Sequence, residues 1–104
     1  MKNTGRQVKD ALYAQVTRIG KAMCSPKRLE LIELLCQGEK PVERLAAEAE
    51  ISMKLASAHL KELRQAHLVE TRREGKNIYY CIDSPQALAV LTILYSQFCG
   101  TPKE

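Results

Sequence analysis

Residues 52–64 read SMKLASAHLKELR, and this stretch decides the fold. Ser52 is a strong candidate for a helix N-cap, because its hydroxyl can accept a hydrogen bond from a backbone N–H of the first turn. Four apolar residues follow at helical spacing, namely Leu55, Ala56, Leu60 and Leu63. Their spacing predicts an amphipathic helix with one apolar stripe.

The remaining face of this predicted helix is small, polar and cationic. It carries Lys54, Ser57, Ala58, His59, Lys61 and Arg64. Short side chains let a backbone approach base edges and cations neutralise phosphates, so this face favours a helix that enters the major groove of DNA. For this segment alone, an ordinary surface helix with a solvated basic face is the default alternative. The neighbouring segments shift the balance toward the first interpretation.

Three more helices are predicted upstream. The first is amphipathic, with apolar residues three or four positions apart at Val8, Leu12, Val16, Ile19 and Met23. Ser25 and Pro26 then mark the start of a second helix, which is apolar nearly all round over residues 27–37 and therefore central. Gly38 ends it, and Pro41 opens a short third helix through Ala49. A connection of two residues then leads to Ser52, and two helices joined so tightly make a helix-turn-helix.

A β-hairpin and a last helix are predicted downstream. Residues 68–73 and 78–82 have the composition of strands, and the turn between them, 74–77, contains a glycine. Residues 83–85 then cap a final apolar helix that ends near Cys99. The predicted class is therefore mainly α with a β-hairpin wing, in the order helix, helix, helix, helix, strand, strand, helix. This is the order of a winged helix-turn-helix, and residues 1–104 are expected to form a single domain.

Composition narrows the possible function. The apolar fraction of 45% suits a folded protein, and the net charge is +4. Residues 52–79 hold six Lys/Arg against three Glu, a net of +3, whereas residues 25–51 hold four against six, a net of −2. Positive charge on the predicted reading unit favours a nucleic-acid partner. No apolar run approaches the roughly 20 residues of a membrane span, and no signal peptide is recognisable, so a cytoplasmic location is expected.

Enzyme and metal sites find no support in the sequence. It contains no Gly-rich phosphate loop, no Gly-x-Ser-x-Gly and no His-Glu-x-x-His, so neither an enzyme nor a cofactor is expected.

Three segments of the chain carry a family resemblance: KAMCSPKRLEL at 21–31, SAHLKEL at 57–63 and LVETRREGKNIYY at 68–80. Together they resemble the ArsR/SmtB family of bacterial repressors, most closely its thiol- or persulfide-sensing and rhodanese-associated subgroups. The resemblance spans about residues 8–99. It implies a sequence-specific transcriptional repressor bound to double-stranded operator DNA. A homodimer through the first and last helices is expected, because their apolar stripes would otherwise face water.

The resemblance also implies a set of DNA-contacting residues. The reading helix would supply Ser52, Lys54, Ser57, Ala58, His59 and Lys61. The hairpin tip, which touches the DNA backbone or the minor groove in the family, would supply Arg72, Arg73, Lys76 and Asn77. His59 has an alternative role, in which it packs against the preceding helix with one ring nitrogen hydrogen-bonded.

The two metal sites usual in the family are absent from this sequence. Relatives bind thiophilic metals through a Cys-x-Cys pair on the helix before the reading helix, and residues 41–46 contain no cysteine. Others bind zinc through acids and histidines on the last helix, and residues 85–99 contain neither. Because zinc needs about four such ligands, no metal site is expected.

The four cysteines leave several interpretations open. Cys24 and Cys36 flank one helix and should lie about 18 Å apart, too far for a disulfide. Cys99 resembles the C-terminal cysteine of the family's persulfide and redox sensors, whose partner cysteine aligns with Glu33 here. Cys36, three residues further on, could replace that partner, which predicts a switch between Cys36 and Cys99. In the alternatives, Cys36 is a buried core residue and Cys99 an idle terminal thiol, or thiolates of Cys24, Cys36 and Cys99 bind arsenite or another thiophilic metal.

Overall fold

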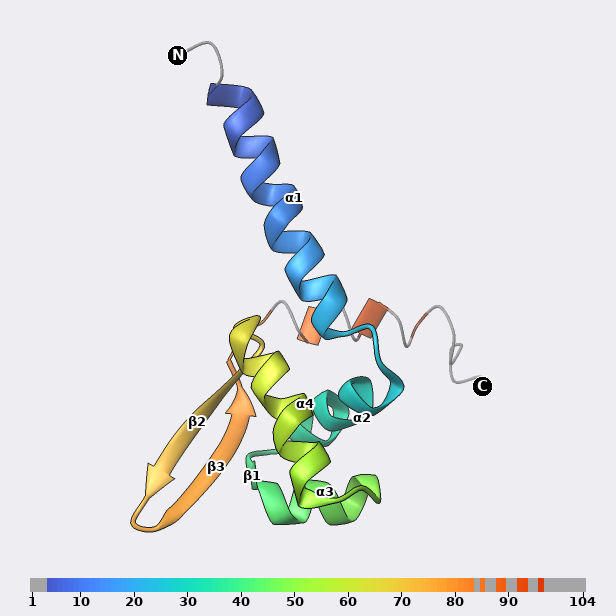
Figure 1. The fold of residues 1–104 in the computed structure, drawn as a ribbon, viewed down its shortest axis with the longest axis vertical. Helices are drawn as coiled ribbons and strands as arrows, with labels where there is room; N and C mark the ends of the chain where they lie inside the picture. The colour runs from blue at the N-terminus through green and yellow to red at the C-terminus, as the bar shows by residue number, and fades with distance from the viewer. Residues whose placement is uncertain (1–3, 84, 86–87, 90–91, 94–95, 97–104) are drawn as a thin grey trace.

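The computed structural model describes residues 4–83, 85, 88–89, 92–93 and 96. Its elements run α1 (Thr4–Ala22), α2 (Pro26–Cys36), β1 (Lys40–Pro41), α3 (Val42–Ala49), α4 (Met53–Gln65), β2 (Val69–Glu74) and β3 (Asn77–Ile82) (Figure 1). The four predicted helices and the hairpin are confirmed, so the fold is mainly helical with a small antiparallel β-hairpin. Of the predicted last helix, the described residues have helical backbone conformation. The other residues of that segment, Cys99 among them, lie outside the described part.

Local side-chain capping explains where α2 and α4 begin. The hydroxyl of Ser25 accepts a hydrogen bond from the backbone N–H of Arg28 at 3.4 Å, and Pro26 follows at the first helical position. The hydroxyl of Ser52 accepts from the N–H of Leu55 at 3.0 Å. Both caps satisfy N–H groups that have no partner inside the helix. The predicted starts of these two helices are therefore confirmed.

A short strand, β1, was not predicted from the sequence. Lys40 pairs with Tyr80 in an antiparallel register, which places β3 in the middle of the sheet order β1-β3-β2. The side chain of Lys40 is buried, and its Nζ donates to the carbonyl oxygens of Leu34 at 2.7 Å and Gly38 at 3.4 Å. The lysine thus binds a carbonyl in the last turn of α2, where Leu34 also accepts from the backbone N–H of Gln37 at 3.2 Å, and a second carbonyl just beyond the helix.

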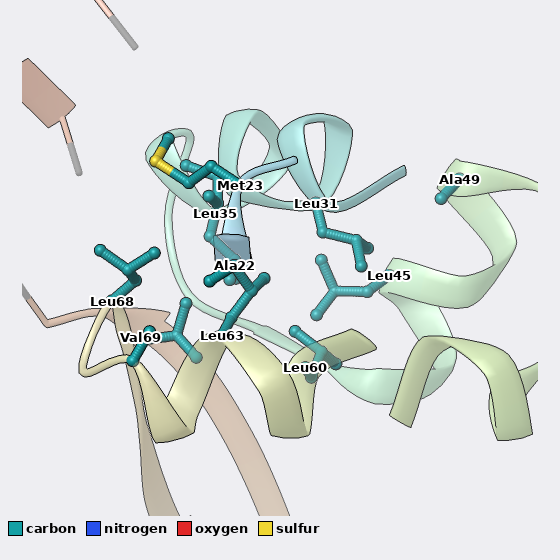
Figure 2. Close-up of a cluster of buried hydrophobic side chains, with 12 residues drawn as sticks. Ala22, Met23, Leu31, Leu35, Leu45, Ala49, Leu60, Leu63, Leu68 and Val69 are labelled. Atoms are coloured by element: carbon teal, nitrogen blue, oxygen red, sulfur yellow. The ribbon is translucent and has the colours of Figure 1, made fainter. Parts of the chain in front are cut away.

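The hydrophobic core lies where α2, α3, α4 and the start of β2 meet. Figure 2 shows Leu31, Leu45 and Leu60, from three different helices, directed into the same interior. All three are fully buried, as are Leu63 and Leu68. This packing holds α4 in place against α2 and α3, so its opposite face is presented to solvent.

Leu55 departs from the predicted apolar stripe of α4. Ala56, Leu60 and Leu63 are fully buried, but Leu55 is 44% exposed. At 3.6 residues per turn, Leu55 is rotated by about 100° from Ala56, which carries it past the edge of the buried face. The assignment of Leu55 to the buried stripe was therefore wrong.

Helix α1 projects away from the rest of the subunit (Figure 1). At its C-terminal end Ala22 is buried, as is the following Met23, and both belong to the core. Along the rest of α1, Val8, Leu12 and Val16 are each more than half exposed. Of the apolar stripe predicted for this helix, Ile19 and Met23 thus pack on the core, and the part formed by Val8, Leu12 and Val16 is left uncovered by the described part of the same chain.

Candidate nucleic-acid interface

The turn between α3 and α4 is closed by backbone geometry. Glu50 takes a left-handed conformation with φ of 59°, and the N–H of Ile51 donates to the carbonyl of Ala46 at 3.0 Å. The left-handed region is unusual for a residue with a side chain, and here it ends α3 and reverses the chain. Ser52 then caps α4 immediately. The end of α3 at Glu50 and the start of α4 at Ser52 therefore lie within three residues, and this fixes the direction in which α4 leaves the turn.

The outer face of α4 gathers five of the six residues predicted to contact DNA from this helix. The exposed residues are Ser52, Lys54, Ser57, Ala58 and Lys61. Within the described part of the chain, neither Lys54 nor Lys61 forms an ion pair. Two cations that form no ion pair with the described residues, beside small side chains, suit a polyanion that must come close to the helix backbone.

His59, the sixth predicted residue, is half-buried and hydrogen-bonded within the protein. Its Nδ1 accepts from Nε of Arg28 at 3.2 Å, and Arg28 also donates to the carbonyls of Lys21 at 3.2 Å and Ala22 at 3.4 Å. One guanidinium therefore links the end of α1 and the body of α2 to α4. This is the kind of packed role foreseen as the alternative for His59, with α2 as the partner helix. Contact between His59 and DNA stays a prediction.

His59 makes folding sensitive to acid. Burial, and then the positive charge of Arg28, hold the pKa of His59 below its ordinary value. For a depressed histidine pKa, the associated stability is complete above the unfolded pKa of about 6.5 and is lost as pH falls through the folded pKa. We expect the free energy of unfolding, measured by urea titration, to fall as pH is lowered from about 7.5 to 5. His59→Gln should flatten this dependence.

A matched control is the only other histidine, His67, which is exposed and has a φ of 62°. His67→Asn is suitable, because asparagine tolerates the left-handed conformation. This variant should keep the acid sensitivity of the parent. An equal loss of that sensitivity in both variants would contradict the assignment to His59.

The hairpin of β2 and β3 presents the predicted wing. Glu74 and Asn77 are paired across a turn in which Gly75 has a φ of 64°, the conformation that glycine adopts without cost. Arg73, Lys76 and Asn77 are exposed at or next to this turn. The structure thus brings three of the four predicted wing residues to one tip.

Arg72, the fourth predicted wing residue, is engaged inside the protein. Its Nε donates to Glu39 Oε1 at 2.9 Å, its Nη1 donates to Glu74 Oε1 at 3.0 Å, and its guanidinium lies 5.0 Å from the centre of the Tyr79 ring. The hydrogen bond from Arg72 lowers the pKa of Glu39, and the two carboxylates raise the pKa of Arg72. Arg72 therefore anchors the wing to the segment before β1. No sequence signal pointed to Glu39, and contact between Arg72 and DNA stays a prediction.

The described cysteines are free thiols. They lie between α1 and α2 (Cys24), at the end of α2 (Cys36) and in β3 (Cys81). Cys36 is exposed at the end of α2, so the interpretation of Cys36 as a buried core residue is wrong. Partial desolvation, and then the negative charge of Glu33, raise the pKa of Cys36. Cys24 is exposed and Cys81 half-buried, whereas Cys99 lies outside the described residues.

The described residues were also searched for a metal site and for a membrane-spanning helix. Among them, no three His, Cys, Asp or Glu side chains are grouped so as to hold a metal ion. None of the helices in this part of the chain is long and apolar enough to cross a membrane.

Comparison with known proteins assigns the chain to a family. The family described as "Bacterial regulatory protein, arsR family" matches residues 25–71, from the cap of α2 into β2. The HTH-type transcriptional regulator Rv0324 of Mycobacterium tuberculosis is 46% identical over 74 residues, which cover 71% of this chain and 33% of that protein. The biofilm growth-associated repressor of Agrobacterium fabrum is 38% identical over 90 residues, covering 86% and 76% of the two chains.

A solved structure extends the match to most of the chain. The homodimeric winged helix-turn-helix DNA-binding domain (fragment 1-100) of Mb0332 from Mycobacterium bovis superposes with a TM-score of 0.82 at 36% identity. The match covers 91% of this chain and 88% of that one. This chain spans one third of the length of the Mycobacterium tuberculosis relative and three quarters of the Agrobacterium one. The chain belongs to the ArsR family of bacterial regulatory proteins, whose members are transcriptional regulators rather than enzymes.

Proposed function

We propose that this protein is a homodimeric transcriptional repressor that binds double-stranded operator DNA in a sequence-specific manner. The observation that carries the proposal is the outer face of α4, where Lys54 and Lys61 are exposed beside small side chains and form no ion pair with the described residues. The relatives named as repressors, and the neighbour described as a DNA-binding domain, support it. As a regulator of genes, the protein would act in the cytoplasm.

The two DNA-contacting elements would contact different parts of the duplex. Helix α4 would enter the major groove with the predicted set Ser52, Lys54, Ser57, Ala58, His59 and Lys61. The wing would contact the backbone or the minor groove through Arg73, Lys76 and Asn77, with Arg72 available if it exchanges Glu39 for a phosphate. The ion pairs of Arg72 support a second role for it, because a wing anchored to the segment before β1 keeps a fixed position relative to α4.

Dimerisation would follow from the uncovered face of α1. Val8, Leu12 and Val16 form a stripe along a projecting helix, and Leu88 and Ile93 of the last segment are also exposed. Contiguous exposed apolar surface of this kind marks an interface. A dimer through α1 and the last helix would place two copies of α4 in successive major grooves, about 34 Å apart, on a nearly palindromic site.

The function is tested by sedimentation together with DNA binding at several salt concentrations. A dimer that enriches particular duplexes from a random-sequence pool, with affinity falling steeply as salt rises, is the expected result. A monomer, or a protein whose duplex binding is absent or independent of salt, would contradict the proposal. The rival is a module that keeps the fold for binding proteins, and charge-removing variants of α4 and the wing separate the two.

For the signal that releases DNA, we propose a thiol switch between Cys36 and Cys99. The exposure of Cys36 supports its access to a second thiol, and its raised pKa disfavours the thiolate, so we assign attack to Cys99 and resolution to Cys36. With diamide as oxidant, the two thiols lose two electrons and two protons to the reagent and become one disulfide. A bridge between α2 and the last helix would change the angle between the two copies of α4.

The switch predicts a defined outcome for oxidised protein. Diamide or an organic persulfide should link Cys36 to Cys99 in mass spectra and lower DNA affinity at least tenfold, an expectation based on the typical size of allosteric coupling. Cys36→Ser and Cys99→Ser should each abolish the response, and Cys81→Ser, the control, should keep it. Release of DNA from the two serine variants as from the parent would exclude the switch.

The alternative signal is arsenite or another thiophilic metal bound by Cys24, Cys36 and Cys99. The predicted 18 Å separation across α2 makes a site within one subunit unfavourable for Cys24 and Cys36 together. Tight arsenite binding that consumes three thiols and releases DNA would favour this alternative over the disulfide.

A further inference from the structure

Leu55 is an apolar side chain on the face of α4 that we assign to DNA. It is 44% exposed, whereas Leu60 and Leu63 of the same helix are fully buried. Ala58, three residues further on, is its neighbour on the helix surface and is also exposed. The two form a small apolar patch, Leu55 with Ala58, within a polar and cationic surface.

The position of this patch indicates what covers it. Leu55 is the third residue of α4, and the first residues of a reading helix are those that meet base edges. Lys54 is its neighbour in sequence, and Lys61 follows Ala58 by three residues on the same helix. Neither lysine forms an ion pair with the described residues, so a protein partner that covered the patch without carboxylates of its own would bury two charges at a high cost in desolvation. DNA supplies phosphates for the lysines and an apolar group for the leucine.

That apolar group is the 5-methyl of thymine. It is the one hydrocarbon group that a base pair displays in the major groove, and apolar side chains recognise it by contact. The branched end of a leucine can enclose a methyl group, and the small side chain of Ala58 leaves room for the base to approach. Serine or asparagine at position 55 would instead select a hydrogen-bonding edge.

We propose that Leu55, assisted by Ala58, contacts a thymine methyl group and is a specificity residue of the operator complex. The proposal rests on the proposed function, because it requires α4 to lie in the major groove. It assigns to Leu55 a preference for A·T over G·C at the base pair it meets. The preference is separate from the phosphate contacts of the lysines, which carry no sequence information.

The test uses duplexes enriched by the protein from a random-sequence pool, remade with deoxyuridine in place of one thymine at a time. Deoxyuridine removes the methyl group and keeps the base pair. Removal of one buried methyl should weaken binding of the parent about fourfold at one position in each half-site. Leu55→Ala should bind the thymine and deoxyuridine duplexes equally, and Leu55→Met should restore part of the difference. Lys76→Ala, the control, should weaken both duplexes and keep their ratio.

The outcomes separate this inference from the proposed function. Salt-dependent binding of the parent with no effect of deoxyuridine at any position would overturn the role of Leu55 and leave the function standing. The same result follows if Leu55→Ala keeps the parent's thymine preference. Failure of the parent to enrich any duplex would overturn both.

Discussion

Replacing Leu60 by alanine should lower the free energy of unfolding by about 2–5 kcal/mol. Leu60 is fully buried between α2, α3 and the body of α4, so its truncation leaves a cavity as well as lost apolar contact (Figure 2). Domains of this size have a total stability of about 5–15 kcal/mol, so the loss is a large share. The melting temperature should fall by roughly 10–30 °C in calorimetry or circular dichroism at fixed protein concentration.

The control for this prediction lies on the same helix. Leu55→Ala removes the same atoms from a side chain that is 44% exposed, and it should cost less than about 1 kcal/mol. Equal melting temperatures for the two variants would contradict the burial of Leu60. A melting temperature of Leu55→Ala close to that of the parent would also show that this variant remains folded, which its binding test requires.

The double variant Lys54→Ala, Arg73→Ala should lose about half of the salt-dependent part of DNA affinity, because Lys61 and Lys76 remain. In a dimer it removes four cations from the interface, two on α4 and two on the wing. Each phosphate contact contributes about 0.9 to the slope of log affinity against log salt. Raising the salt from about 50 to 200 mM should therefore weaken DNA binding by the variant about a hundredfold less than it weakens binding by the parent. At the lower salt concentration the variant should already bind much more weakly than the parent. Fluorescence anisotropy with an enriched duplex measures both quantities.

A variant of equal charge gives the comparison. Lys9→Ala, Arg18→Ala removes the same number of positive charges from α1, where both side chains are exposed and neither belongs to the predicted DNA-contacting set. Its slope should stay close to that of the parent. A similar reduction in both variants would mean that net charge, rather than the position of Lys54 and Arg73, governs binding.

The parts of the fold that sequence reasoning predicted are those determined by near neighbours. Ser25 and Ser52 cap helices whose first N–H groups lie three residues away, so the signal and its effect are both local. The predicted apolar stripe of α4 is buried at Ala56, Leu60 and Leu63. The prediction was wrong at Leu55, because the edge of a helical stripe depends on the neighbouring elements that cover it. Strand β1 was missed because two residues show no periodicity.

The parts of the site that were not foreseen depend on pairs far apart in sequence. Arg72 meets Glu39 from 33 residues away, and Arg28 meets His59 from 31 residues away. Sequence reasoning assigned Arg72 to DNA and gave Arg28 no role, and only the folded arrangement shows that both are hydrogen-bonded within the protein. Local spacing located the reading helix and the wing tip, but it could not separate cations that are free to meet phosphate from cations that hold the fold together.

The projecting helix α1 has a consequence for gene dosage. A helix of 19 residues that packs on its own subunit near one end is marginally stable in water on its own. In the dimer that we propose, the first part of α1 becomes ordered when a second copy covers it, so folding of that part and association are one event. The number of complete DNA readers then rises with the square of the chain concentration at low copy number. Halving expression would remove about three quarters of the dimers that can bind DNA. A regulated gene would then respond more steeply to the chain concentration than it would to a monomeric regulator.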